Sequence, residues 1–162
     1  MLKRKTLTPE NALTRLEAEC SRTEHCTSEM FDRLRKWGIT GATASKIVEH
    51  LQAENFINDR RYASAFVRNK LMFNHWGRRK ISVAMMLKHI DRTIIRDALE
   101  QIDETDYRDI LLRTMRTKAR QIKEGNTYEG RTKLYRAMLS RGFESAAISA
   151  IIRNPESMLW ES

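Results

Sequence analysis

The sequence has few of the residues that interrupt helices, since its 162 residues include only two prolines and six glycines. Proline and glycine are the least favourable residues inside a helix. Leucine, alanine, arginine, lysine, glutamate and methionine, which favour helices, are plentiful. The composition therefore predicts an all-α protein.

Long apolar runs are also missing, and Cys20 and Cys26 are the only cysteines. A membrane-spanning helix needs roughly 20 consecutive apolar residues, and no run approaches that length. The basic start from Met1 to Thr8 lacks the apolar core of an export signal. We therefore expect a cytoplasmic protein with no membrane partner, in which both cysteines stay thiols; a bridge between them is the less favoured alternative.

Motifs of the common enzyme classes are absent as well. The sequence contains no phosphate-binding glycine loop, no nucleophile elbow and no paired-histidine helix motif. The four histidines are far apart, and His25 with the two cysteines lacks the four-ligand spacing of a zinc site. We expect a protein that is not an enzyme and that has no catalytic residues, no metal and no cofactor.

What the sequence does contain is a weak internal repeat. Three segments share one spacing of apolar positions: Met30, Leu34 and Ile39 correspond to Ile81, Met85 and Ile90, and again to Leu134, Met138 and Phe143. The step is 51 residues from Ile39 to Ile90 and 53 from Ile90 to Phe143. The spacing predicts three tandem repeats at 8–54, 55–102 and 103–153, with tails at 1–7 and 154–162.

Each repeat has room for three helices. Gly38 and Gly142 follow the middle helix of the first and third repeats and suit a left-handed stop, whereas His89 in the second is a poorer stop. Thr8, Asn58 and Asp106 are the expected caps of the opening helices. About 50 residues bury little alone, so we expect the repeats to stack in an elongated, curved array.

Positive charge is concentrated in the middle of the chain. Residues 55–102 contain 10 Lys/Arg against 4 Asp/Glu, whereas 1–54 contain 9 against 8 and 103–162 contain 11 against 9, in a chain of net charge +9. A local positive field attracts polyanions, and nucleic acid is the commonest one in the cytosol. A basic surface that serves only solubility is the alternative interpretation.

Several motifs of the middle repeat resemble the RecX family. The run LQAENFINDRRYA, from Leu51 to Ala63, with Phe66, Val67 and Arg68 after it, is similar to the family's leucine helix, acidic turn and arginine, aromatic, alanine triplet. The run GRRKI, which begins at Gly77, resembles the family's glycine and basic pair before an isoleucine. Lys88 and Ile90 resemble its helix-ending lysine, glycine, isoleucine, and the whole resemblance spans roughly Thr8 to Arg153.

The chain departs from the family pattern at four positions. Asn58 stands where the family usually has aspartate, Tyr62 where it has phenylalanine, Ala84 where it has glutamate and His89 where it has glycine. The helical spacing of Tyr62, Ala63, Phe66 and Val67 favours a place in the core. Asp59 is expected to cap a helix, and Trp76 to pack, with base stacking as the alternative.

The resemblance implies a regulator that binds the groove of the RecA filament on single-stranded DNA and blocks filament growth, strand exchange and ATP hydrolysis. Single-stranded DNA would be contacted directly or within the filament, and the protein would be a monomer. The expected contact residues are the basic residues of the middle repeat: Arg60, Arg61, Arg68, Lys70, Arg78, Arg79, Lys80 and Lys88. Two alternatives stay open: a DNA-binding module that acts without RecA, and a helical scaffold for another protein.

Overall fold

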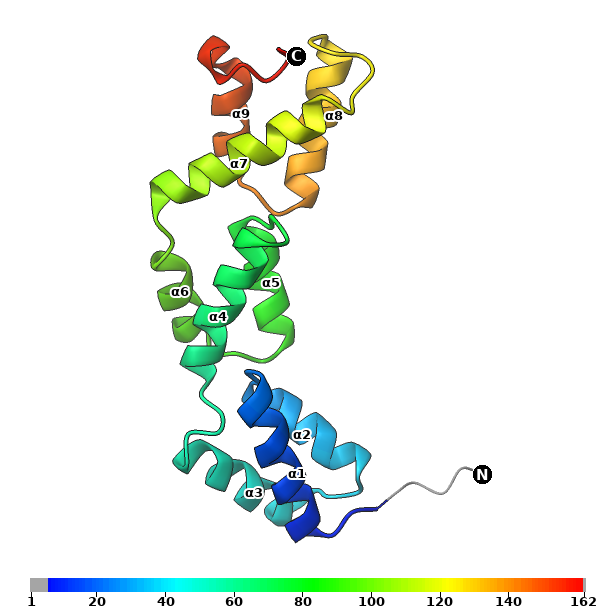
Figure 1. Ribbon diagram of the computed structural model, residues 1–162, viewed down its shortest axis with the longest axis vertical. Helices are drawn as coiled ribbons and strands as arrows, with labels where there is room; N and C mark the ends of the chain where they lie inside the picture. Colours follow the sequence, from blue (N-terminus) through cyan, green and yellow to red (C-terminus); the bar gives the residue numbers. More distant parts are fainter. Residues whose placement is uncertain (1–5, 162) are drawn as a thin grey trace, which may run out of the picture. The chain divides into compact units, whose positions relative to one another are not determined.

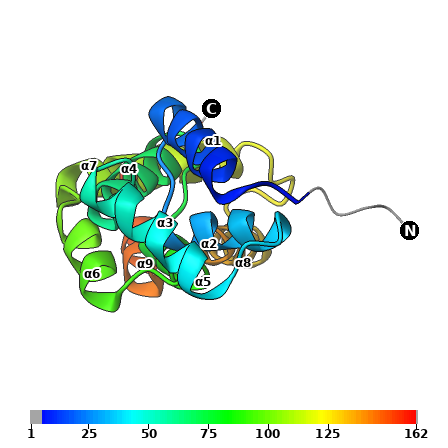
Figure 2. The same cartoon turned by 90° about the horizontal axis from the view of Figure 1, so that it is seen from below.

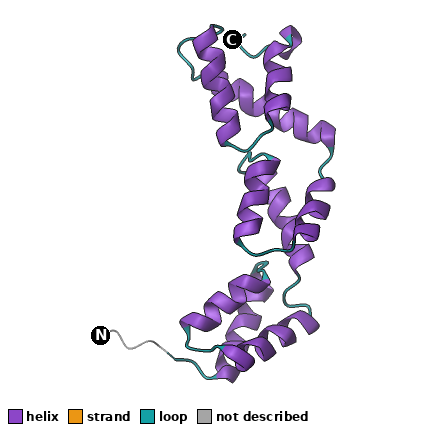
Figure 3. Ribbon diagram, turned by 180° about the vertical axis from the view of Figure 1, so that it is seen from behind, coloured by secondary structure: helices purple, strands orange, loops and turns teal. Residues whose placement is uncertain are grey.

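The computed structural model describes residues 6–161, which form nine α-helices and one short 3-10 helix, with no strand in that range (Figures 1 and 3). The helices are α1 (Pro9–Arg22), α2 (Thr27–Lys36), α3 (Gly41–Ala53), α4 (Asp59–Met72), α5 (Arg78–Leu87), α6 (Arg92–Glu100), α7 (Glu104–Ala119), α8 (Tyr128–Ser140), α9 (Ser145–Arg153) and η1 (Pro155–Ser157). They follow one another as three sets of three. The prediction of an all-α repeat array is confirmed.

The repeated apolar positions are the centre of the core. Met30, Leu34, Ile81, Met85, Leu134, Met138 and Phe143 are fully buried, and Ile39 and Ile90 are 7% and 5% exposed. All nine positions that share the repeat spacing are therefore buried: six lie on one helical face, as the four-residue step predicts, and three follow the end of the helix.

The same backbone stop ends the middle helix of each set. Gly38, His89 and Gly142 all have positive φ, at +78°, +57° and +91°. The residue after each donates its N–H to a carbonyl in the last helical turn, such as Ile90 to Met85 O at 3.2 Å. This is the bond pattern of a Schellman stop, so the predicted left-handed stop is confirmed, and histidine adopts it where glycine would be less strained.

Caps of the opening helices agree with the sequence in two cases of three. Thr8 Oγ1 accepts from the N–H of Asn11 at 3.2 Å, and Asn58 Oδ1 accepts from that of Arg61 at 3.0 Å. The expected cap at Asp106 is wrong: Asp103 Oδ1 accepts from the Asp106 N–H at 3.0 Å, so α7 begins three residues earlier. Asp103 lies directly before Glu104, the first residue of α7, so the sequence analysis placed the start of this helix too late.

The described chain divides into two compact units, which we treat separately. The first contains the residues up to Ala65 together with Met85–Ile95, and the second contains Phe66–Ala84 and the residues from Arg96 onward. Helices α4, α5 and α6 therefore each contribute residues to both.

In the first unit, α3 packs on both α1 and α2 (Figure 2). Its core is formed by Ala12, Leu16, Met30, Leu34, Ile39, Ala44, Ile47, Val48, Leu51 and Ile57. The expected cap at Asp59 is wrong for its own helix, because Asn58 caps α4 and Asp59 is the first residue inside it. Asp59 Oδ1 instead accepts from the N–H and the hydroxyl of Thr27 at the start of α2, at 2.8 and 3.1 Å. Tyr62 and Ala63 are buried in the first unit and Val67 in the second, as expected, while Phe66 is half-buried.

In the second unit, α7, α8 and α9 pack on one another. The start of α5 joins them through its backbone, because the Gly77 N–H donates to Arg141 O at 2.7 Å and the Arg79 N–H to Gly142 O at 3.0 Å. A Cβ on Gly77 would lie 2.3 Å from the Phe143 nitrogen. Only glycine permits this approach of two backbones.

Candidate basic interface

The predicted basic residues fall in both units. Arg60, Arg61 and Lys88 belong to the first unit, and Arg68, Lys70, Arg78, Arg79 and Lys80 belong to the second. Some of these side chains form ion pairs or hydrogen bonds within the protein, and others do not. Those without such contacts have more of their charge available to a partner.

Two of the three residues in the first unit hold that unit together. The Arg61 guanidinium lies 2.6 Å from Glu24 Oε1 and donates to the Asn55 carbonyl at 3.0 Å. Arg61 therefore ties the turn before α4 to the end of α1. Lys88 Nζ lies 3.8 Å from Glu29 Oε2, and the Ser28 hydroxyl donates to the Lys88 carbonyl at 2.6 Å.

Glu29 is the carboxylate that contacts Lys88, and it also interacts with Cys26 and His25. It accepts from the Cys26 N–H at 3.3 Å and lies 3.4 Å from His25 Nδ1. Burial alone would raise its pKa, but the hydrogen bonds from Cys26 and the charge of Lys88 outweigh it, so the pKa of Glu29 is below its ordinary value. Glu29 therefore stays ionised, and its negative charge partly offsets the positive charge of Lys88.

Among the predicted basic residues of the second unit, Arg78 has the most contacts with other side chains. Its guanidinium forms ion pairs with Glu104 and with Glu144, the latter at 3.3 Å, and lies 3.9 Å from the centre of the Tyr107 ring. The Arg78 N–H donates to the Tyr107 hydroxyl, which donates to Glu144 Oε2 at 2.6 Å. Burial and this bond to Glu144 raise the pKa of the Tyr107 hydroxyl above its ordinary range. Arg78 therefore fastens α5 to α7 and to the start of α9.

The two lysines of the second unit flank one aromatic ring. Lys70 Nζ and Lys80 Nζ lie 4.7 and 4.5 Å from the centre of the Trp76 ring, which is half-buried. Arg68 and Arg79 are exposed, and within residues 6–161 their side chains have no ion-pair or hydrogen-bond partner. These four cations are therefore the predicted residues whose charge is most available.

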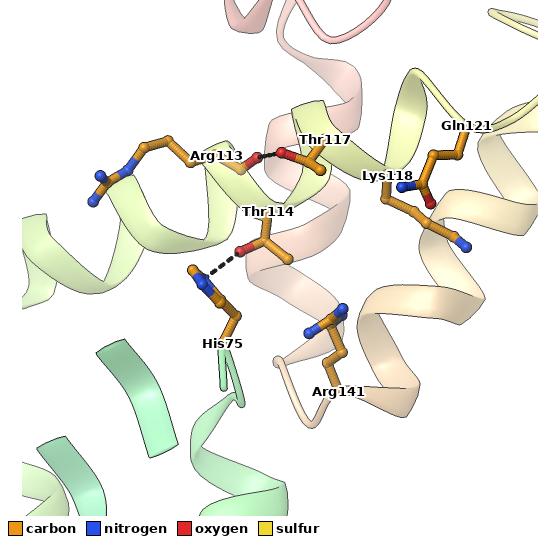
Figure 4. Close-up of a pocket in the computed structure, with 7 residues that line it drawn as sticks. All are labelled: His75, Arg113, Thr114, Thr117, Lys118, Gln121 and Arg141. Atoms are coloured by element: carbon orange, nitrogen blue, oxygen red, sulfur yellow. Dashed lines mark hydrogen bonds between the residues drawn. The ribbon is translucent and has the colours of Figure 1, made fainter. Parts of the chain in front are cut away.

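A second basic surface, which the sequence analysis missed, lies on α7 and α8. A pocket of about 180 Å³ is lined by His75, Arg113, Thr114, Thr117, Lys118, Gln121 and Arg141 (Figure 4). A pocket of about 470 Å³ shares Lys118 and Gln121 with it and is also lined by Ile122, Lys123, Glu124, Lys133, Arg136 and Ala137. We call the two together the α7–α8 groove.

The charge count by segment concealed this groove, because acidic residues at the other end of α7 cancel its cations in the sum. The helical spacing was the signal that could have found it. Thr114 and Lys118 recur at i and i+4 and so share one face of α7, and Gln121 follows in the turn just after the helix ends.

Two further findings concern other kinds of site. Residues 6–161 contain no group of three or more His, Cys, Asp or Glu side chains placed to hold a metal ion. Within the same range, none of the helices combines the length and the apolar character that crossing a membrane requires.

Two family models match the part of the chain that carries these surfaces. The model described as RecX, second three-helix domain, matches residues 58–99, and the model described as RecX, third three-helix domain, matches residues 105–152. Together they cover more than half of the sequence. The chain belongs to the RecX family.

Relatives named regulatory protein RecX agree with the assignment of this chain to the RecX family. Regulatory protein RecX of Clostridium perfringens (strain 13 / Type A) is 30% identical over 127 residues, which are 77% of this chain and 59% of that protein. That of Clostridium beijerinckii (strain ATCC 51743 / NCIMB 8052) is 31% identical over the same shares. The chain thus spans about three fifths of the length of these relatives.

Two crystal structures of RecX proteins have the same fold as this chain. The crystal structure of RecX from Lactobacillus salivarius matches with a TM-score of 0.80 and 23% identity, over 90% of this chain and 94% of that one. A second crystal structure of regulatory protein RecX matches with a TM-score of 0.79 and 20% identity, over 90% of this chain and 71% of that one. At these identities the likeness concerns the fold.

Proposed function

We propose that this chain is a negative regulator of RecA that binds the RecA filament on single-stranded DNA and inhibits filament growth, ATP hydrolysis and strand exchange. The match to two successive RecX three-helix domains is the observation that carries this proposal. Relatives named regulatory protein RecX support it. The protein acts by binding and catalyses no reaction.

The basic residues supply part of the affinity for the filament and speed the encounter. RecA filaments on DNA carry the phosphate charges of the strand, and a cationic helical array is attracted to such a polyanion. Among the eight residues of the predicted contact set, Arg68, Lys70, Arg79 and Lys80 have the most available charge. Arg61 and Arg78 act mainly by holding their own units in shape, because carboxylates of those units already engage them.

The first test measures ATP hydrolysis by RecA on single-stranded DNA while this protein is titrated in at well below one molecule per RecA. Strong inhibition at these ratios is the expected result, because blocking a growing filament end affects many RecA subunits at once. No effect even at equal amounts would exclude the proposed regulation and favour a DNA-binding module or a scaffold.

A further inference from the structure

The exposed face of α5 is apolar at positions where the other two repeats are charged or polar, with Leu139 as the exception. The three apolar residues of this face are Val83, Met86 and Leu87. Their counterparts in the repeat alignment are Asp32, Arg35 and Lys36 in the first repeat and Arg136, Leu139 and Ser140 in the third. All nine residues are exposed. The repeated fold therefore does not require apolar residues at these positions.

The three apolar residues lie on one side of a single helix. Val83, Met86 and Leu87 are 52%, 48% and 75% exposed. Their spacing of three and four residues places them on one helical face. Because α5 is continuous from Arg78 to Leu87, helical spacing alone defines this face. Exposed apolar residues scattered singly are ordinary, whereas a group of them on one surface marks a place for a partner.

Positive charge lies at both ends of this face. Arg79, four residues before Val83, is exposed and has no side-chain partner among residues 6–161. Lys88, whose charge Glu29 offsets in part, follows Leu87 directly. The sequence from Arg78 to Ile90 contains no aspartate or glutamate. The face is therefore complementary to apolar side chains that are flanked by carboxylates.

Two other occupants fit this face less well. A second copy of α5 would bring Arg79 against Arg79 in a parallel pair, or against Lys88 in an antiparallel pair. Like charges brought together across an interface cost affinity. The phosphates and sugars of a nucleic acid form hydrogen bonds and ionic contacts, which three apolar side chains cannot return. A protein surface that combines apolar and acidic groups matches both the side chains and the charge.

We propose that Val83, Met86 and Leu87 dock α5 onto the protein part of the RecA filament, at an apolar surface edged by carboxylates. This inference rests on the proposed function and adds to it the residues that contact RecA itself rather than DNA. Burial of the three side chains supplies affinity that salt does not screen, while Arg79 orients the helix through a carboxylate of the partner.

The test compares inhibition of RecA ATP hydrolysis on single-stranded DNA by the unchanged chain and by the triple variant Val83→Gln, Met86→Gln and Leu87→Gln. The variant keeps every charge, so both basic surfaces retain their cations. Its concentration for half-inhibition should be about tenfold higher, at 50 and at 200 mM KCl alike, because apolar contacts are lost and ionic ones are kept. Full inhibition by the triple variant would overturn the inference.

A matched control replaces three exposed apolar residues outside α5: Tyr128→Gln, Leu139→Gln and Met158→Gln. This control should inhibit as well as the unchanged chain, and a loss equal to that of the triple variant would overturn the inference. Leu87→Gln alone, at the most exposed of the three positions, should raise the concentration for half-inhibition by about threefold. This single variant keeps the test valid if urea unfolding shows that the triple variant is less stable.

Two further measurements identify the occupant. Fluorescence anisotropy of a labelled oligo-dT without RecA should be the same for the triple variant and the unchanged chain. A weaker binding by the variant there would show that the face contacts DNA, and would overturn the inference. No inhibition of RecA by the unchanged chain would overturn the proposed function and this inference together, whereas inhibition that the triple variant retains overturns this inference alone.

Discussion

Arg78 and Arg79 are neighbours in the chain, yet one side chain is held by ion pairs and the other is exposed to solvent. Arg78 is 22% exposed and engages Glu104, Glu144 and Tyr107, whereas Arg79 is exposed and without a side-chain partner among residues 6–161. The family resemblance treats the two as one basic pair. The structure separates them into a residue that stabilises the fold and a residue available to a partner.

A pair of single variants tests this separation. Arg78→Ala should lower the free energy of unfolding by about 2 kcal/mol, because charged hydrogen bonds of this kind contribute about 1.5–3 kcal/mol. Arg79→Ala should change it by less than about 0.5 kcal/mol, while raising the amount of protein needed for half-inhibition of RecA. Urea unfolding and the ATP hydrolysis assay measure the two effects, and equal stability losses in both variants would contradict the assignment.

At the scale of helices, the second unit depends on the close approach of two backbones. A Cβ on Gly142 would lie 2.4 Å from both the nitrogen and the Cβ of Lys80, and its φ of +91° is unfavourable for any other residue. The approach brings the loop between α8 and α9 against the first turn of α5. Glycine at 142 therefore serves the packing of helices as well as ending α8.

Replacing Gly142 by alanine should lower the free energy of unfolding by about 3 kcal/mol, since backbone strain and an overlap with Lys80 add together. Gly125→Ala is the matched control, because Gly125 has a φ of +58° but nothing within 4 Å of the added Cβ. It should cost only about 1 kcal/mol for the left-handed conformation. Chemical unfolding of both variants checks this, and a similar loss in each would show that the contact with Lys80 is relieved at little cost.

The helices also show what the sequence could predict. The sequence predicted all nine repeated core positions, because six of them lie four residues apart on one helical face and the other three follow the helix end at the same spacing in each repeat. The stop at His89 could be inferred only from its alignment with Gly38 and Gly142, since histidine itself is a weak signal. The α7–α8 groove could not be found from segment charges, because it depends on which face of α7 meets α8 and the loop at His75.

At the scale of the molecule, the chain has a net charge of +9 and includes two basic surfaces. One follows the motifs of the middle repeat, and the other follows α7 and α8 in the last. The part of the chain that the two family models match begins at residue 58 and includes both basic surfaces. A regulator built in this way would draw on electrostatic attraction over much of its length.

Inhibition of RecA should therefore weaken steeply as salt rises. Between 50 and 200 mM KCl the protein concentration for half-inhibition should increase by about tenfold or more, because several phosphate contacts are lost together. RecA hydrolysis without the inhibitor, measured at each salt concentration, corrects for the salt response of RecA itself. Half-inhibition that stayed constant across this range would show that apolar contacts carry the affinity and that the exposed arginines and lysines contribute little to it.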